Sequence, residues 1–214
     1  MEGQGLMRIV NAGYEIITPM NRDTVLKRIE EIGRVCYKSE DLITSESASK
    51  FVTMLVKRGH EAMIEHCSIS VKFICDRGVS HEIVRHRIAS YAQESTRYCN
   101  YSKDKFNNEI TVIKPCFWEV HSAHYGTWEI ACRQSEKAYF ELLENGATPQ
   151  EARSILPNSL KTEIVVTYNL REWRNFFKLR TASLAHPQMR EITIPLLNEF
   201  KTYLPEIFGD IEVV

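Results

Sequence analysis

The chain has 214 residues, of which 43% are hydrophobic and 26% are charged, and its formal net charge at pH 7 is -1. These values are typical of one globular domain, and the small net charge argues against a general nucleic-acid binder, which would carry a broad basic surface. No apolar run approaches membrane-spanning length, and the N-terminus lacks a basic segment followed by an apolar core. We therefore expect a single cytoplasmic domain, residues 1–214, with no membrane or nucleic-acid partner.

Short apolar runs predict the strands. Some of these runs alternate apolar and polar side chains, which is the period of a strand, and others are separated by turn residues such as Asn-Ala-Gly. The expected strand regions are residues 7–18, 67–75, 109–115 and 162–170.

Apolar side chains at helical spacing predict the helices. Asn21 is a plausible N-cap for the first helix, and Thr148 with Glu151 forms a capping box. Pro195 and Pro205 should bend or break the last helical region. The expected helices are residues 21–37, 47–60, 79–91, 122–145, 148–156, 171–180 and 188–208. Because few strand–helix–strand units occur, the pattern predicts an α+β fold, with a mostly antiparallel sheet flanked by helices.

The segment RHRIASYAQESTRY, residues 85–98, concentrates three Arg with one Glu and no Lys. Arg is suited to phosphates, carboxylates and imide edges. On the expected helix Glu82 and Arg85 share one face, and a turn after that helix would aim Ser95 and Arg97 at the same region. Such a nest of donors would bind a phosphate or a planar heterocycle. A surface helix with incidental ion pairs explains the composition equally well.

A second group of polar side chains lies in YNLREWRNFFKLR. Trp173, Phe177 and Arg180 recur at helical spacing, so Arg180 extends an aromatic stripe. A cation there requires an anion, a π face or a ligand, and pairing with a core carboxylate is the simpler alternative. Asn169 and Arg171 lie at a strand-to-helix junction, where side chains and backbone amides commonly bind ligands.

The segment GHEAMIEH has the form of a ligand or capping loop. His60 follows a helix-ending Gly, and Glu65 and His66 precede a strand. It does not match a zinc motif, because its second His lies too late for H-E-x-x-H and Ala62 stands where the inverted form requires His. We expect no metal site.

The cysteines form no C-x-x-C pair, and in a reducing compartment such thiols are mostly small buried side chains. They are Cys36, Cys67, Cys75, Cys99, Cys116 and Cys132.

One signature resembles that of a known family. Arg85, His86, Arg87, Ser95 and Arg97 match the R-H-R-x7-S-x-R pattern of the flavin-dependent thymidylate synthases. The order of the neighbouring segments is also similar, with GHEAMIEH before the signature and EARSILP and YNLREWRNFFKLR after it. The resemblance extends over nearly the whole chain.

This resemblance implies a methyltransferase that makes dTMP from dUMP. It implies 5,10-methylenetetrahydrofolate as one-carbon donor, NADPH as reductant and tightly bound FAD, in a homotetramer with shared active sites. Arg180 would be the catalytic residue, stabilising charge that develops on the pyrimidine. The residues expected to hold FAD are His60, Arg85, His86, Arg87, Gln93, Asn169, Arg171 and Asn175. Those expected to hold dUMP are Glu82, Arg85, Glu94, Ser95, Arg97, Arg153 and Arg180.

Further expectations accompany this assignment. A tetramer would cover Trp173 and Phe176, which the aromatic helix would otherwise expose. Neither Cys99 nor Ser95 should act as a nucleophile, because hydride from reduced flavin replaces one. Two other classes stay open: a non-catalytic nucleotide- or RNA-binding protein that uses the same arginines, and a different flavoprotein acting on pyrimidines.

Overall fold

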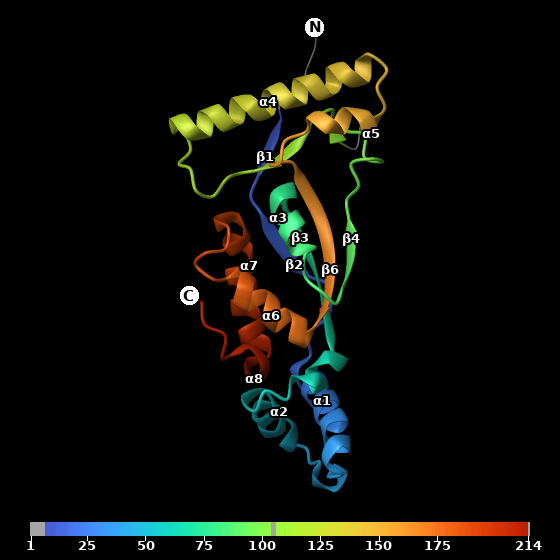
Figure 1. Cartoon of the computed structure of the whole chain (residues 1–214), viewed down its shortest axis with the longest axis vertical. Coiled ribbons are helices and arrows are strands. Elements are labelled where there is room, and N and C mark those ends of the chain that lie inside the picture. Colours follow the sequence, from blue (N-terminus) through green and yellow to red (C-terminus); the bar gives the residue numbers. More distant parts are fainter. Residues whose placement is uncertain (1–6, 104–105, 214) are drawn as a thin grey trace. The chain divides into compact units, whose positions relative to one another are not determined.

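The protein has a mixed α and β fold. The computed structural model describes residues 7–103 and 106–213, so the N-terminal segment used to argue against a leader lies partly outside the described residues. An antiparallel sheet with strand order β2-β3-β6-β4 is flanked by helices (Figure 1). Strand β1 pairs separately with β5 in parallel. The α+β fold expected from the sequence is confirmed. The strands are β1 Arg8–Val10, β2 Gly13–Ile16, β3 Ser68–Asp76, β4 Ala89–Gln93, β5 Thr111–Ile113 and β6 Lys161–Asn169.

The chain divides into two compact units. Unit 1 contains the residues up to Gly13, Phe73–Val84 and Ala92–Ile164, and unit 2 contains Tyr14–Lys72, Arg85–Tyr91 and Val165–Val214. Strands β2, β3, β4 and β6 each contribute residues to both units, so most of the boundaries fall within strands and not at a linker.

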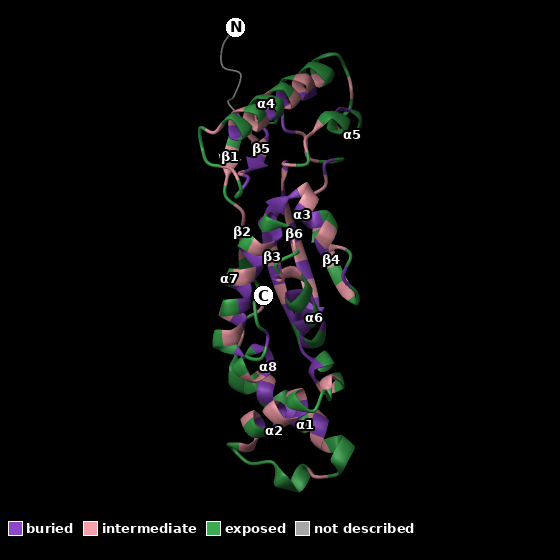
Figure 2. Cartoon of the chain, turned by 60° about the vertical axis from the view of Figure 1, so that its left-hand side comes forward, coloured by how far each residue is buried: buried purple, intermediate pink, exposed green. Residues whose placement is uncertain are grey.

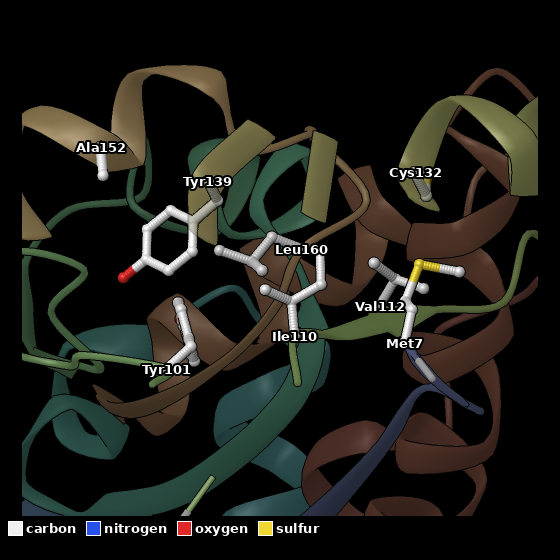
Figure 3. Packing of buried hydrophobic residues seen from close by; sticks show 8 residues of the cluster. All are labelled: Met7, Tyr101, Ile110, Val112, Cys132, Tyr139, Ala152 and Leu160. Atoms are coloured by element: carbon white, nitrogen blue, oxygen red, sulfur yellow. The ribbon is translucent and has the colours of Figure 1, made fainter. Parts of the chain in front are cut away.

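Unit 1 is built around the long helix α4. Its described helices are α3 Arg77–Ile83, α4 Ala123–Glu144, α5 Pro149–Ala152 and the 3-10 helix η4 Arg153–Ile155. A cluster of buried side chains from α4, β5 and their neighbouring segments forms its core (Figure 3). The cluster consists of Met7, Tyr101, Ile110, Val112, Cys132, Tyr139, Ala152 and Leu160. Tyr101 and Tyr139 pack edge to face with ring centroids 5.7 Å apart, a favourable aromatic geometry.

Unit 2 has an aromatic core. Its helices are α1 Arg22–Tyr37, η1 Glu40–Leu42, α2 Ser47–Lys57, η2 Glu61–His66, α6 Leu170–Arg180, α7 Pro187–Tyr203 and α8 Pro205–Phe208. Trp173 stacks on Phe177 with centroids 5.5 Å apart, and both rings contact Phe200. The Trp173 indole N–H donates to the Ile69 carbonyl oxygen at 3.0 Å, which fixes α6 against β3. Figure 2 shows buried residues along the strands and exposed residues on the outer faces of the helices.

Most of the expected elements are present, with the caps that their sequences predict. The Asn21 side chain accepts a hydrogen bond from the Thr24 backbone N–H at 3.0 Å and begins α1. The capping box of Thr148 and Glu151 is formed at the start of α5. Along β3, every second side chain is buried, as the alternation predicts.

The helix expected over residues 79–91 is the main error. The helix α3 ends at Ile83, and Ala89–Gln93 is the strand β4. Ile88, one of the apolar side chains at helical spacing in this segment, is 85% exposed. Glu82 and Arg85 therefore do not share a helix face. Pairing within the sheet determines the conformation of residues 89–93, because their mixed polar and small side chains have little preference for helix or strand.

Packing also overrides sequence signals in the last helix. The helix α7 continues through Pro195, and the chain breaks only before Pro205. A proline inside a helix costs about 3 kcal/mol, but the flanking turns bury Ile192, Leu196 and Leu197 and hold the helix together.

Several smaller expectations need correction. The helix expected over 148–156 is one α turn followed by η4, and the segment containing Glu65 is a 3-10 helix and not a loop. Trp173 and Phe176 are fully buried within a single chain, so they give no argument for a tetramer. The expectation of buried thiols holds for Cys67, Cys75 and Cys132, whereas Cys99 is half-buried and Cys36 and Cys116 are exposed.

Candidate functional site: a polar cavity and an arginine network

A polar cavity of about 460 Å³ lies in unit 2. Its walls come from η2, from the turn before β4 and from the first turns of α6. This volume is within the range of small-ligand and cofactor sites. The lining residues are Glu61, Glu65, Arg87, Ile88, Asn169, Arg171, Glu172, Arg174, Asn175 and Lys178.

The start of α6 positions one wall of the cavity. The Asn169 side chain ends β6 and accepts a hydrogen bond from the Glu172 backbone N–H at 2.8 Å, which makes Asn169 the N-cap of α6. Arg171, Asn175 and Lys178 follow on the same helical face, because residues three and four positions apart lie above one another. Asn169 and Arg171 thus lie at a helix N-terminus, where negative charge is stabilised, while Asn175 and Lys178 extend the polar wall along α6 to its last turn.

The arginine side chains of the cavity are held in place by hydrogen bonds and ion pairs. Arg171 donates to Glu65 at 2.6 Å and lies 3.7 Å from Glu61, while its side chain is 54% exposed. Arg87 is exposed, and one of its guanidinium N–H groups donates to the His86 carbonyl oxygen at 3.0 Å. Arginine in such a setting presents a planar set of donors to phosphate groups and heterocycle edges.

A second network lies beside the cavity and involves Arg180. The Arg180 Nε–H donates to His86 Nε2 at 3.0 Å, and His86 Nδ1 lies 2.8 Å from Glu172 Oε1. His86 and Glu172 are buried, with 5% and 8% of their surface exposed. Burial lowers the pKa of His86, the bond to Glu172 opposes this, and the Arg180 charge lowers it further. The imidazole is therefore neutral at physiological pH.

A third group lies in unit 1, in the turn after β4. Ser95 Oγ accepts from the Arg97 backbone N–H at 3.3 Å, and the Ser95 carbonyl oxygen accepts from the backbone N–H of Tyr98 and of Cys99. Arg153 donates to the Thr96 hydroxyl at 3.3 Å. The turn and η4 thus bring together a serine hydroxyl and two exposed arginines, which is a donor set suited to a phosphate.

The other expected site residues lie in different surroundings. In unit 1, Gln93 donates to the Ser80 hydroxyl at 2.9 Å, and Glu94 accepts from Lys161 at 3.4 Å. In unit 2, His60 Nδ1 lies 2.9 Å from the Tyr37 hydroxyl and does not line the cavity. Glu82, half-buried at the end of α3, and Arg85, exposed, complete the expected set.

Two residues that sequence reasoning missed are prominent in unit 2. Glu172 joins the cavity wall to His86. The Arg174 guanidinium is only 3% exposed; it contacts Asp210 through two bonds of 2.6 and 2.8 Å, Glu61 at 2.9 Å and the Ile207 carbonyl oxygen. Their spacing in the sequence gave no signal, because their main partners, His86 and Asp210, lie 86 and 36 positions away.

Two sets of hydrogen-bond donors, one in each unit, indicate the class of protein. Arginines and amides around a cavity, with a second set of arginines beside a serine, are the groups by which proteins bind nucleotides. Across residues 7–103 and 106–213, no three His, Cys, Asp or Glu side chains gather as a metal ion requires, and no helix is long and apolar enough to cross a membrane.

Comparison with known proteins identifies the family. A family model described as "Thymidylate synthase complementing protein" matches residues 18–206. The chain is 32% identical over 184 residues to the flavin-dependent thymidylate synthase of Geobacter sulfurreducens, covering 83% of this chain and 78% of that protein. It is 33% identical over 182 residues to the enzyme of the same name from Pyrococcus furiosus, covering 85% and 74%. The chain belongs to the flavin-dependent thymidylate synthase family, as the resemblance predicted.

Proposed function

We propose that this chain makes dTMP from dUMP, with 5,10-methylenetetrahydrofolate as one-carbon donor, NADPH as reductant and FAD as tightly bound cofactor. The observation that carries the proposal is the polar cavity of unit 2. It gathers Arg87, Asn169, Arg171 and Asn175, four of the residues expected to hold FAD, from segments about 80 positions apart in the sequence.

The chemistry of these donors fits FAD. Its pyrophosphate requires cations and N–H groups, which Arg87, Arg171 and the start of α6 supply. Its heterocycles require neutral donors and acceptors, which the amides of Asn169 and Asn175 supply. FAD itself would supply hydride transfer, while the protein supplies binding and orientation. By resemblance, His60, Arg85 and Gln93 would also contact FAD, in this subunit or in another subunit of the proposed tetramer. Both ring nitrogens of His86 are already bonded, to Arg180 and to Glu172, so His86 would support the site without offering a ring nitrogen to FAD.

The remaining residues would bind and activate dUMP. Ser95, Arg97 and Arg153 would hold the phosphate and sugar, with Glu82, Glu94 and Arg85 as further contacts. Methylation requires a nucleophilic C5 on the uracil, and a cation at the imide edge favours the electron-rich form. Arg180 would provide this charge, and its bond to the neutral His86 ring supports a fixed orientation of the guanidinium.

Two arginine substitutions test the proposal. Arg180→Ala should retain flavin and its reduction by NADPH but fail to bind or methylate dUMP, because the charge-assisted contact, about 1.5–3 kcal/mol, is lost. Arg180→Lys should recover little, because a point charge does not reproduce the planar set of donors. Arg87→Ala should instead lose flavin. Arg133→Ala, which removes an arginine paired with Glu129 on α4, is the matched control.

The measurements are the flavin-to-protein absorbance ratio, dUMP titration of the flavin spectrum and tritium release from C5-labelled dUMP. The site assignments are reversed if Arg180→Ala loses flavin while Arg87→Ala keeps it. A colourless wild-type protein that shifts RNA in a gel would favour the non-catalytic binder.

We also propose a single cytoplasmic domain that assembles as a homotetramer. Strands β3 and β6, which run through both units, support one domain. The proposed tetramer rests on the family resemblance, because single exposed apolar side chains such as Leu184 and Ile88 are normal at a protein surface. Light scattering should give four times the 24.8 kDa chain mass, and a monomer would contradict the tetramer.

A further inference from the structure

Glu172 contacts both the asparagines of the cavity wall and the buried His86 ring that meets Arg180. Its backbone N–H donates to the Asn169 side chain, and its carboxylate oxygens accept from the Asn175 amide at 3.2 and 3.3 Å. Both asparagines line the cavity. The same carboxylate meets His86, whose other ring nitrogen meets Arg180.

The direction of the hydrogen bonds follows from the chemistry of the groups. The Arg180 Nε carries a proton at all accessible pH values and can only donate. His86 Nε2 must therefore offer its lone pair, so the single proton of the neutral ring is on Nδ1. That proton points to Glu172 Oε1. An ionised carboxylate has no proton to donate, so this oxygen is the acceptor. A carboxylate at this position thus selects the tautomer that receives Arg180.

The surroundings of His86 leave its ring little freedom. The ring packs edge-on against Phe176 at 5.0 Å, and the Tyr91 hydroxyl donates to the His86 carbonyl oxygen at 2.7 Å. The ring is 5% exposed, so water is a poor substitute for either neighbour. A buried histidine fixed on three sides transmits the position of one bonded partner to the other.

We propose that Glu172 is a positioning residue that orients the Arg180 guanidinium through the Nδ1-protonated His86 ring. The substrate class affected is the pyrimidine nucleotide, and this part rests on the proposed role of Arg180. Glu172 also holds Asn175, so one carboxylate couples the wall of the cofactor cavity to the residue that meets the pyrimidine.

The first test reads the tautomer directly. In full-length holoenzyme labelled with ¹⁵N-histidine, NMR at pH 8 should show His86 protonated at Nδ1. Glu172→Leu should abolish this preference, whereas Glu65→Gln, which removes a carboxylate paired with Arg171 in the same cavity, should leave it unchanged. A wild-type His86 protonated at Nε2 would overturn the proposal, whatever the role of Arg180 proves to be.

The second test is a double-mutant cycle read by dUMP titration of the flavin spectrum. Glu172→Leu should weaken dUMP binding by about 10- to 100-fold, because the Arg180 guanidinium loses its fixed orientation and a hydrogen bond to a charged group contributes a factor of about this size. His86→Leu should weaken it similarly, and the double variant should be no weaker than either alone, because both break the same chain. If the double variant weakens dUMP binding by the product of the two single effects, Glu172 does not act through His86 and the proposal is wrong. Should Glu172→Leu not fold, Glu172→Gln replaces it in both tests, with a smaller but still non-additive effect.

The two proposals fail in different ways. If Arg180→Ala binds dUMP as tightly as the wild type, the role assigned to Arg180 under the proposed function is wrong. In that case the tautomer of His86 and its response to Glu172→Leu still test whether Glu172 orients Arg180 through His86.

Discussion

Glu136, in the middle of α4, should contribute strongly to the stability of unit 1. Its two carboxylate oxygens accept hydrogen bonds from the backbone N–H of Met7 at 3.2 Å and of Ile110 at 2.9 Å. These residues directly precede β1 and β5, which pair with each other. The side chain is 8% exposed, so one buried carboxylate satisfies two backbone donors and ties both strands to the helix.

The structure sets the size of the effect. A hydrogen bond to a charged group contributes about 1.5–3 kcal/mol, and a buried N–H left without a partner costs about 1–3 kcal/mol. Removing the carboxylate also removes its desolvation cost, which offsets part of the loss. Glu136→Leu should therefore lower the free energy of unfolding by about 2–4 kcal/mol. Glu136→Gln keeps one acceptor but turns an NH₂ group towards the other N–H, and should cost about 1–2 kcal/mol.

The assay is urea denaturation at fixed protein concentration, followed by circular dichroism. Glu144→Gln, an exposed carboxylate on the same helix, is the control and should change stability by less than about 0.5 kcal/mol. Burial raises the pKa of Glu136, so its contribution is greatest below the ordinary carboxyl pKa and declines as the pH rises through the folded-state pKa. The gap between wild type and Glu136→Gln should narrow from acid to neutral pH. A Glu136→Leu protein as stable as the wild type would refute this reasoning.

Two further predictions concern cysteine and the buried arginine. Cys99→Ala should keep substantial turnover in the tritium-release assay, because we expect hydride from reduced flavin to replace a thiol nucleophile; complete loss with flavin still bound would contradict this. Arg174→Met should lower the melting temperature more than Asp210→Asn does, because the guanidinium is 3% exposed and holds several partners whereas the Asp210 side chain is 55% exposed. Equal shifts would show that the Asp210 contact alone accounts for the effect.

The sequence predicted elements well where one local signal was strong. Asn21 caps α1, and the alternation in 67–75 became β3, because capping and periodicity act over a few residues and need no knowledge of the rest of the chain. The helix predicted to include residues 89–91 was wrong for the opposite reason. Residues 89–93 form a strand because β6, beside them in the sheet, supplies hydrogen-bond partners, and no spacing of apolar side chains in the sequence indicates that pairing.

The candidate site was predictable to a similar extent. The segment order and the R-H-R signature predicted Arg87 and Arg171 as site residues, and the structure places both on the polar cavity; their role in binding stays a prediction. Glu172 and Arg174 belong to no such pattern. A charged residue on a helix usually indicates a solvated face, and the buried partners of these two, His86 and Asp210, lie 86 and 36 positions away. Only the folded chain brings such partners together.

The helix α6 explains why so much of the chemistry depends on eleven residues. Successive side chains differ by about 100° around a helix, so a short helix can present distinct faces. One face buries Trp173 and Phe177 in the aromatic core, and another lines the polar cavity with Arg171 and Asn175. The core face fixes the rotation of the helix, and the contacts of Arg171 with Glu65 and of Asn175 with Glu172 hold the polar side chains in place. Repacking the aromatic residues should therefore disturb flavin and pyrimidine binding together, whereas substitutions on the polar face should separate them.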